Sequence, residues 1–257
     1  SEVLISSPKP NWAEQDPGNW WENCQVAIKK VIKKANIDGK LIDAIGISYQ
    51  MHGLVMVDKN QNVLRPSIIW CDSRAIDQGN KALETLGQSY CTNNLLNAPG
   101  NFTASKLAWV KENEPEIFEK CYKFMLPGDF VSMKLTGEIT ITNSGLSEGI
   151  FWDFKNNCIS QQVLDVFGID ISLVPEIKNV FDNHGKIKAN VAADLGLNPN
   201  AKVCYKAGDQ PNNAMSLNVL NPGELAATAG TSGVIYGVTD KVKCDRMSRI
   251  NGFGHVN

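Results

Sequence analysis

The sequence predicts an α/β layered domain followed by the beginning of a second domain. Helix-like and strand-like segments alternate along the 257 residues, which is the pattern of layered α/β proteins. Hydrophobic residues make up 43% of the chain and charged residues 20%, an ordinary composition for a globular protein. A new pair of strand-like segments begins after Pro222-Gly223. We therefore expect one domain over residues 1–221 and the start of another over residues 222–257.

The first helix is predicted over residues 17–35. Asp16 can cap its N-terminus, and Pro17 has a fixed φ angle that suits the first turn. Lysines crowd its last turn and Gly39 follows, as is typical of a helix end. Its apolar positions would share one face: Trp21, Cys24, Ile28, Val31 and Ile32.

Short elements are expected along the rest of the chain. Strands are predicted at 41–48, 67–70 and 203–205, with hairpins formed by 54–58 and 62–64 and by 224–229 and 234–238. Helices are predicted at 75–87, 103–114, 115–124, 161–167, 190–195 and 211–218, and one from Leu126 to before Gly137. The segment 140–153 is rich in Thr, Ser, Asn and Gly and is predicted to be a loop with short strand pieces.

Several classes of protein are disfavoured by composition. The net charge is −2 without a basic block, so nucleic-acid binding is not expected. No apolar run approaches the roughly 18 residues of a membrane span, and the N-terminus lacks the pattern of a signal peptide. The seven scattered cysteines and three histidines do not have the spacing of a disulfide framework or a zinc site. We expect a cytoplasmic protein without a protein-bound metal.

Asp209 is the first candidate for chemistry. It lies between a predicted strand and a predicted helix, at the strand end where α/β proteins bind ligands. A carboxylate there can face a bound hydroxyl group and accept its proton. The structural alternative is that Asp209 only caps the following helix, and the spacing alone favours this alternative.

The segment Gly230-Thr231-Ser232-Gly233 is the second candidate. Its backbone N–H groups and two hydroxyls in a tight turn can bind phosphate. The alternative is a hairpin turn that needs glycine for its backbone conformation. The chain has no G-x-x-x-x-G-K-[ST] motif, so this is not a P-loop.

Two further groups of side chains follow predicted strands. Met51 and His52 come after the strand 41–48, where a polar group can contact a ligand, although a lone histidine is more often structural. Trp70, Asp72 and Arg74 follow the next strand and offer an apolar face and charged hydrogen bonds to a sugar. The alternative for these three is an Asp–Arg ion pair beside a core tryptophan.

Seven motifs follow one another along nearly the whole chain. They are 12–21 (WAEQDPGNWW), 45–53 (IGISYQMHG), 64–66 (LRP) with 69–74 (IWCDSR), 102–110 (FTASKLAWV), 126–130 (LPGDF), 207–210 (AGDQ) and 230–233 (GTSG). In this order they resemble the FGGY family of carbohydrate kinases, and within it the bacterial xylulose kinases. The resemblance also has departures: Asn101 is unusual in its motif, and Pro211-Asn212-Asn213 replaces small residues after Asp209.

The resemblance implies an actin-like, ribonuclease-H-like fold with a mixed sheet flanked by helices, and a second similar domain beginning near residue 222. It implies that Asp209 is the general base and that Met51 and His52 contact a ketose. Trp70, Asp72 and Arg74 would line the same pocket, and Gly230, Thr231 and Ser232 would approach the phosphates of ATP. A D-x-G-T-S phosphate loop is expected upstream of Ser1, and an adenosine-binding region after Asn257.

The implied activity is phosphorylation of D-xylulose with ATP and Mg²⁺, by an enzyme that often forms a homodimer. The Q-M-H-G form of the second motif favours D-xylulose over glycerol or gluconate, while ribulose, gluconate and glycerol stay as alternative substrates. Two other classes are weighed against this one. They are a non-catalytic sugar-binding protein on the same fold and an actin-like ATPase that handles polymers or peptides.

Overall fold

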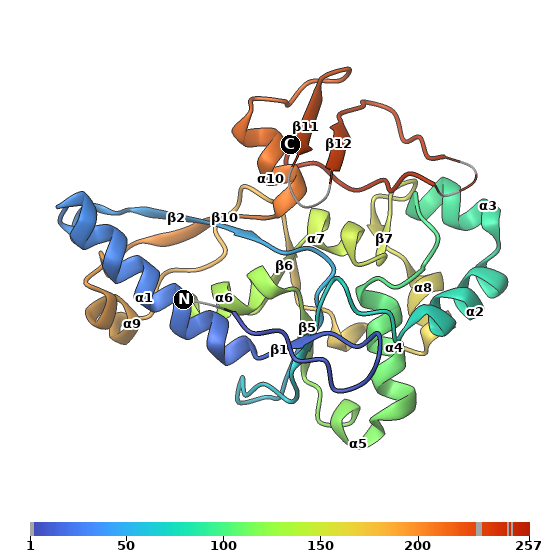
Figure 1. Ribbon diagram of the computed structural model, residues 1–257, viewed down its shortest axis with the longest axis horizontal. Helices are drawn as coiled ribbons and strands as arrows, with labels where there is room; N and C mark the ends of the chain where they lie inside the picture. The colour runs from blue at the N-terminus through green and yellow to red at the C-terminus, as the bar shows by residue number, and fades with distance from the viewer. Residues whose placement is uncertain (1–2, 230–232, 246, 248) are drawn as a thin grey trace.

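The computed structural model describes residues 3–229, 233–245, 247 and 249–257 (Figure 1). Its helices are α1 Pro17–Ala35, α2 Ile76–Leu86, α3 Gln88–Tyr90, α4 Thr103–Asn113, α5 Pro115–Phe118, α6 Pro127–Thr136, α7 Asn143–Glu148, α8 Gln161–Phe167, α9 Ala189–Leu195 and α10 Asp209–Ser216. Its strands are β1 Glu14–Gln15, β2 Ala44–Tyr49, β3 Val55–Val57, β4 Ser67–Ile68, β5 Lys123–Met125, β6 Thr140–Thr142, β7 Trp152–Asp153, β8 Cys158–Ile159, β9 Glu176–Lys178, β10 Lys202–Gly208, β11 Leu225–Ala229 and β12 Gly233–Gly237.

Parallel and antiparallel strand pairs both occur, as a mixed α/β fold requires. The strands β2 and β10 run parallel, as do β6 and β9. Antiparallel pairs are formed by β1 with β4, β3 with β5, β7 with β8 and β11 with β12. Figure 1 shows β2 and β10 side by side with α1 and α9 below them, while α10, β11 and β12 form the upper part of the view. The predicted α/β class is confirmed.

The helix α1 has the predicted bounds and the predicted N-terminal chemistry, but Asn36 rather than Gly39 ends it. The Asp16 side chain accepts a hydrogen bond from the Gly18 N–H, and Pro17 occupies the first helical position. Asn36 ends the helix in the left-handed conformation, with φ 52°. The predicted apolar face is only partly correct, because Val31 is 60% exposed while Trp20 is buried in the core.

Three predicted segments differ from the structure. The helix expected over 115–124 ends at Phe118, and β5 then pairs with β3. The loop expected over 140–153 contains α7, whose N-terminus is capped by the Thr142 hydroxyl. The hairpin of 54–58 and 62–64 forms, but with only one bridge, between Val57 and Val63. The strand β3 pairs along its other edge with β5.

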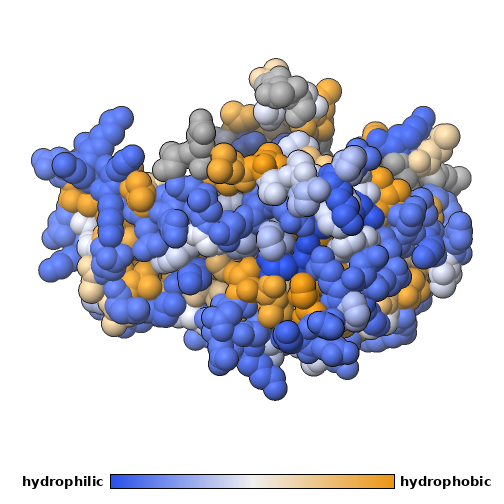
Figure 2. Space-filling model, turned by 60° about the horizontal axis from the view of Figure 1, so that its bottom comes forward, coloured by the Kyte–Doolittle hydropathy of each residue, from blue (hydrophilic) through white to orange (hydrophobic). Residues whose placement is uncertain are grey.

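The core lies between these helices and strands. Phe124 and Phe151 stack with ring centroids 4.7 Å apart within the largest buried cluster. Figure 2 shows one face of the molecule on which hydrophilic residues cover most of the area and hydrophobic residues gather in small separate groups. Among the helices of the described residues, none is long and apolar enough to cross a membrane.

Candidate active site

The parallel strands β2 and β10 end side by side, because Tyr49 pairs with Gly208 at the last position of their register. Residues directly after both strands therefore meet at one edge, where α/β proteins bind ligands. Met51 and His52 follow β2, and Asp209 follows β10 as the first residue of α10. The predicted base and the two predicted sugar contacts thus lie at the same edge.

Asp209 does not have the role of a helix cap. Gly208 is the N-cap residue of α10, and Asp209 lies one position inside the helix. Its half-buried carboxylate accepts a hydrogen bond of 3.0 Å from the Gln210 Nε2. A carboxylate in the first turn is favoured by the positive end of the helix dipole. The capping alternative therefore does not describe this side chain, and the assignment as a base stays a prediction.

His52 is held in one orientation by its neighbours. Its backbone has φ 62°, in the left-handed region, and its Nδ1 lies 3.0 Å from the backbone oxygen of Glu148. The ring contacts Phe102 and Phe253, with centroids 4.8 Å and 5.2 Å away. Because a carbonyl only accepts, Nδ1 must carry the proton of the neutral ring, which leaves Nε2 as an acceptor.

The charge state of His52 follows from its surroundings. Burial, followed by the nearby Lys106 cation, lowers the pKa of His52 to about 4, and the hydrogen bond to the Glu148 carbonyl offsets this only in part. The ring is therefore neutral at pH 7. A neutral ring with a free Nε2 acceptor can receive a hydrogen bond from a sugar hydroxyl.

Asp72 and Arg74 form a buried ion pair, as in the structural alternative weighed above. Their Oδ2 and Nη2 atoms are 2.7 Å apart, and Arg74 Nη1 lies 2.7 Å from Glu14 Oε1. Asp72 also accepts a hydrogen bond from the Ala13 N–H. Trp12 lies under the Arg74 guanidinium, 3.7 Å from ring centroid to Cζ. These contacts fasten the N-terminal segment to the loop after β4, and the polar groups of both side chains are engaged by the protein.

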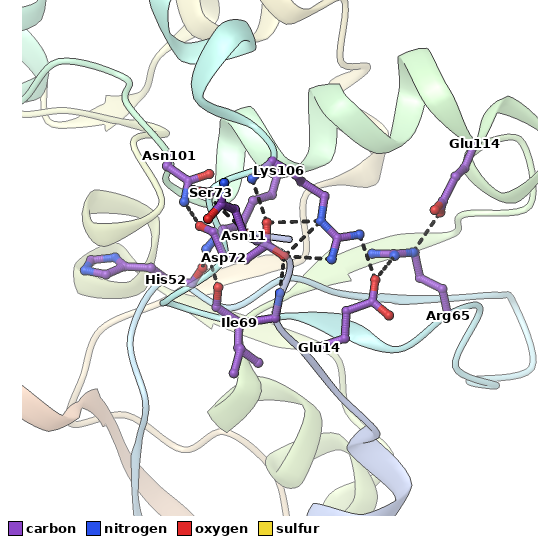
Figure 3. A network of polar contacts seen from close by, with 12 residues as sticks. Asn11, Glu14, His52, Arg65, Ile69, Asp72, Ser73, Asn101, Lys106 and Glu114 are labelled. Atoms are coloured by element: carbon purple, nitrogen blue, oxygen red, sulfur yellow. Dashed lines mark hydrogen bonds and ion pairs between the residues drawn. The ribbon is translucent and has the colours of Figure 1, made fainter. Parts of the chain in front are cut away.

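The ion pairs extend from Glu14 to Arg65 and Glu114. Arg65 contacts Glu14 at 2.6 Å and Glu114 at 2.7 Å. Figure 3 shows Glu14 between Arg65 and the Asp72 group, with the His52 ring directed away from them. Trp70, expected to be in the core under the structural alternative, is 59% exposed. Of the three predicted side chains in this loop, Trp70 is the one available to a ligand.

Lys106 is a site residue to which the sequence assigned no role. Its side chain is fully buried on α4, and Nζ donates hydrogen bonds to the carbonyls of His52 and Ile69, at 2.7 Å and 3.0 Å (Figure 3). It thereby joins the segment after β2 to the segment after β4. Burial lowers the pKa of Lys106 to about 7 despite the nearby Asp72 carboxylate. Its position among apolar residues in FTASKLAWV was the available signal.

Glu148 was not among the predicted site residues either, because it lies at the end of α7, in a segment that was predicted to be a loop. It is 2% exposed, and neither carboxyl oxygen has a hydrogen-bond partner among the described residues. Burial raises the pKa of Glu148 well above its usual range, and the Asp129 and Asp209 charges add to this shift. The Tyr49 hydroxyl lies close enough to the carboxyl to offset this shift in part. No sequence pattern marked this glutamate as buried.

The predicted phosphate contacts Gly230, Thr231 and Ser232 lie outside the described residues. Across residues 3–229, 233–245, 247 and 249–257, no group of three or more His, Cys, Asp or Glu side chains is placed to hold a metal ion. The described part of the candidate site is therefore the edge where β2 and β10 end, which carries Asp209, Met51, His52 and the buried Glu148. We call it the sugar-side edge after its predicted ligand.

The mixed α/β fold places a carboxylate and a neutral histidine at adjoining strand ends, and comparison with known proteins gives the family of the chain. The family model described as "FGGY family of carbohydrate kinases, N-terminal domain" matches residues 1–216. The chain belongs to this family.

Individual relatives agree with the family assignment. The xylulose kinase of Bacillus subtilis is 31% identical over 247 residues, which cover 96% of this chain and 50% of the relative. The crystal structure of xylulose kinase from Rhodospirillum rubrum superimposes with a TM-score of 0.88 at 26% identity, over 95% of this chain and 50% of that one. Gluconate kinase from Lactobacillus acidophilus gives a TM-score of 0.84 at 25% identity, over 91% and 47%.

These similarities confirm the predicted actin-like fold and the predicted resemblance to FGGY kinases. The chain spans about half the length of the curated relatives that it matches. The division at residue 222 stays a prediction.

Proposed function

We propose that the complete protein transfers a phosphoryl group from ATP to D-xylulose, giving D-xylulose 5-phosphate, with Asp209 as the general base. The observation that carries the proposal is the register of β2 and β10, which brings Asp209 beside Met51 and His52 at one ligand-binding edge. Similarity to xylulose kinases at about 30% identity over nearly the whole chain supports the choice of a ketopentose.

Each sugar-side residue has a definable task in this proposal. Asp209 accepts the proton of the terminal hydroxyl as its oxygen attacks phosphorus. The neutral His52 ring accepts a hydrogen bond from a second hydroxyl through Nε2. Met51 and Trp70 supply apolar surface, while Asp72 and Arg74 hold the loop that carries Trp70.

The nucleotide side of the reaction rests on family membership. ATP with Mg²⁺ would supply the phosphoryl group and neutralise the charge on the phosphates. Gly230, Thr231 and Ser232 are the residues of this chain proposed to approach the phosphates, by their match to the family motif. We also propose a cytoplasmic protein, and a homodimer that light scattering would detect.

Gluconate is the second candidate substrate, because a gluconate kinase is among the similar structures. Ribulose and glycerol complete the panel of alternatives. A kinase assay of the full-length protein over these compounds is the direct test of substrate. The highest kcat/KM with D-xylulose supports the proposal, and a higher value with another compound replaces D-xylulose by that compound.

The base assignment has its own test. Asp209→Asn in the full-length enzyme should lower kcat by about a thousandfold or more while sugar binding by calorimetry changes little, because proton acceptance is lost but shape is kept. Asp77→Asn is a control at an exposed aspartate in the first turn of another helix. Near-normal turnover of the Asp209 variant would contradict the assignment. Sugar binding without any phosphorylation by the wild-type protein would favour the non-catalytic sugar-binding alternative.

A further inference from the structure

The carboxyl group of Glu148 lies against the last residue of β10, next to Asp209. A Cβ atom built on Gly208, the residue before Asp209, would be 2.9 Å from Glu148 Oε2 and 2.5 Å from Met51 Cγ. The carboxyl and the Met51 side chain therefore lie against the same glycine. The backbone oxygen of Glu148 accepts the hydrogen bond from His52 Nδ1. Glu148 thus lies against Met51, next to Gly208, which precedes Asp209, and accepts a hydrogen bond from His52.

Glu148 is an unusual group to bury in this way. It is 2% exposed, and both carboxyl oxygens lack a hydrogen-bond partner within the described residues. The Tyr49 hydroxyl is the nearby donor of the protein. Buried polar side chains are nearly always hydrogen-bonded, so the remaining hydrogen-bonding positions of this carboxyl are open to a ligand. Burial and the nearby carboxylates raise the pKa of Glu148 well above its usual range. A carboxyl group offers acceptor oxygens, and also one donor when it is protonated, so either form can hydrogen-bond a hydroxyl group.

Two nearby buried lysines, in contrast to Glu148, have hydrogen-bond or ion-pair partners within the protein. The Lys106 ammonium has two carbonyl acceptors, and Lys206 is paired with Asp129. Gly208, Met51 and Glu148 are tightly packed. The Met51 side chain is flexible because it is unbranched and has three rotatable bonds, so it can move aside when a ligand approaches the carboxyl. Access to the carboxyl is therefore compatible with its burial in the free protein.

We propose that the Glu148 carboxyl is a specificity-determining group that hydrogen-bonds a sugar hydroxyl other than the one whose proton Asp209 accepts. This inference rests on the proposed sugar-kinase function. A site built to hydrogen-bond a hydroxyl discriminates strongly against an analogue that lacks it, because the buried polar group is then left unpaired. Glu148 thereby selects among sugars that offer the same terminal hydroxyl to Asp209.

The test is a cycle that combines enzyme variants with sugar analogues. Full-length wild type, Glu148→Met and Glu148→Ala are assayed with D-xylulose and with analogues deoxygenated at C1, C3 or C4. We expect Glu148→Met to lower kcat/KM for D-xylulose by about a hundredfold. For the one analogue that lacks the contacting hydroxyl, the same substitution should change kcat/KM by less than about threefold.

Two controls separate this role from a purely structural one. Glu138→Gln changes an exposed glutamate close to the same helix and should leave kcat/KM unchanged for every sugar. Thermal unfolding checks the variants, and replacing an unpartnered carboxyl by an apolar side chain is expected to preserve folding. If Glu148→Met does not fold, Glu148→Ala, which leaves space at the same point, is compared over the same analogues.

The outcomes are distinguishable. Equal losses for all sugars, or no loss for any, overturn the role of Glu148 and leave the kinase proposal intact. If wild type phosphorylates none of the sugars, the kinase proposal fails, and calorimetry decides the question of Glu148. Weaker D-xylulose binding by the Glu148 variants, with unchanged binding of one deoxy analogue, then supports the contact. Identical binding by wild type and variants, or no binding at all, overturns it.

Discussion

Lys206 and Asp129 form an ion pair with Nζ and Oδ1 2.6 Å apart, and neither side chain is more than 1% exposed. Lys206 Nζ also donates to the carbonyl and the hydroxyl of Thr140, so all three of its protons have acceptors. The pair joins β10 to α6, directly behind the site edge. Removing one partner leaves an uncompensated buried charge.

We therefore expect Lys206→Met to lower the free energy of unfolding by about 3–5 kcal/mol. The double variant Lys206→Met, Asp129→Leu should recover a large part of this loss, because no charge is left unpaired. Denaturant titration measures both. The control is Lys29→Met, which breaks an exposed pair with Asp194 and should cost less than about 1 kcal/mol. Equal effects at the two sites would contradict the expectation.

Lys106 should act as a positioning residue for the sugar. In Lys106→Met the carbonyls of His52 and Ile69 lose their common donor, so the two segments that flank the sugar are no longer held together. We expect KM for the ketopentose to rise about tenfold with a smaller change in kcat, since the lost contact affects binding rather than proton transfer. The matched control is Lys111→Met on the same helix, whose lysine bonds carbonyls away from the site. A fall in kcat at unchanged KM would argue against positioning.

His52 should make stability depend on pH in one direction. Its folded pKa of about 4 lies below the ordinary value of 6.5, so the unfolded chain binds the proton more readily between these values. The contribution to stability is present above pH 6.5 and is lost as pH falls towards 4. His52→Gln removes this dependence, and the difference in unfolding free energy from wild type should change by about 1.4 kcal/mol per pH unit in that window. Unfolding titrations of both proteins between pH 4.5 and 7 measure this difference. A difference that does not change with pH would refute the prediction.

Glu148 should act in the opposite direction. Its folded pKa lies above the ordinary value of 4.5, so the folded protein binds the proton more tightly than the unfolded chain. Stability therefore falls as pH rises from 4.5 towards the folded pKa, by about 1.4 kcal/mol per pH unit. Glu148→Gln should be more stable relative to wild type at pH 8 than at pH 5, as measured by denaturant titration. A difference that does not grow with pH would show that the carboxyl is not buried as a proton-bearing group.

Local chemistry predicted those parts of the fold that local contacts decide. The helix 17–35 was correct in both bounds because Asp16, Pro17 and Asn36 act within the helix itself. The end of α6 before Gly137 was correct for the same reason, as Gly137 has φ 84°. In contrast, β5 and α7 depend on partners distant in sequence, and no periodicity in their few residues indicates them.

The candidate site shows the same division. The motifs indicated Asp209, Met51 and His52, which strand register brings together. They could not indicate that Asp72 and Arg74 use their polar groups on Glu14 and Ala13, because the N-terminal segment folds back onto this loop. Nor could they indicate Glu148, whose burial results from packing of α7 against β10.

Because Trp70 is exposed, it can serve as an intrinsic fluorescence probe. All six tryptophans lie within the described residues, and Trp70 is the exposed one, while the others are buried or half-buried. A ligand that covers the Trp70 indole would move it from water into an apolar contact, so its emission should shift to shorter wavelength. The remaining indoles would change little, and a Trp70→Phe variant would isolate the signal. Sugar occupancy could then be followed by fluorescence without a label and without turnover.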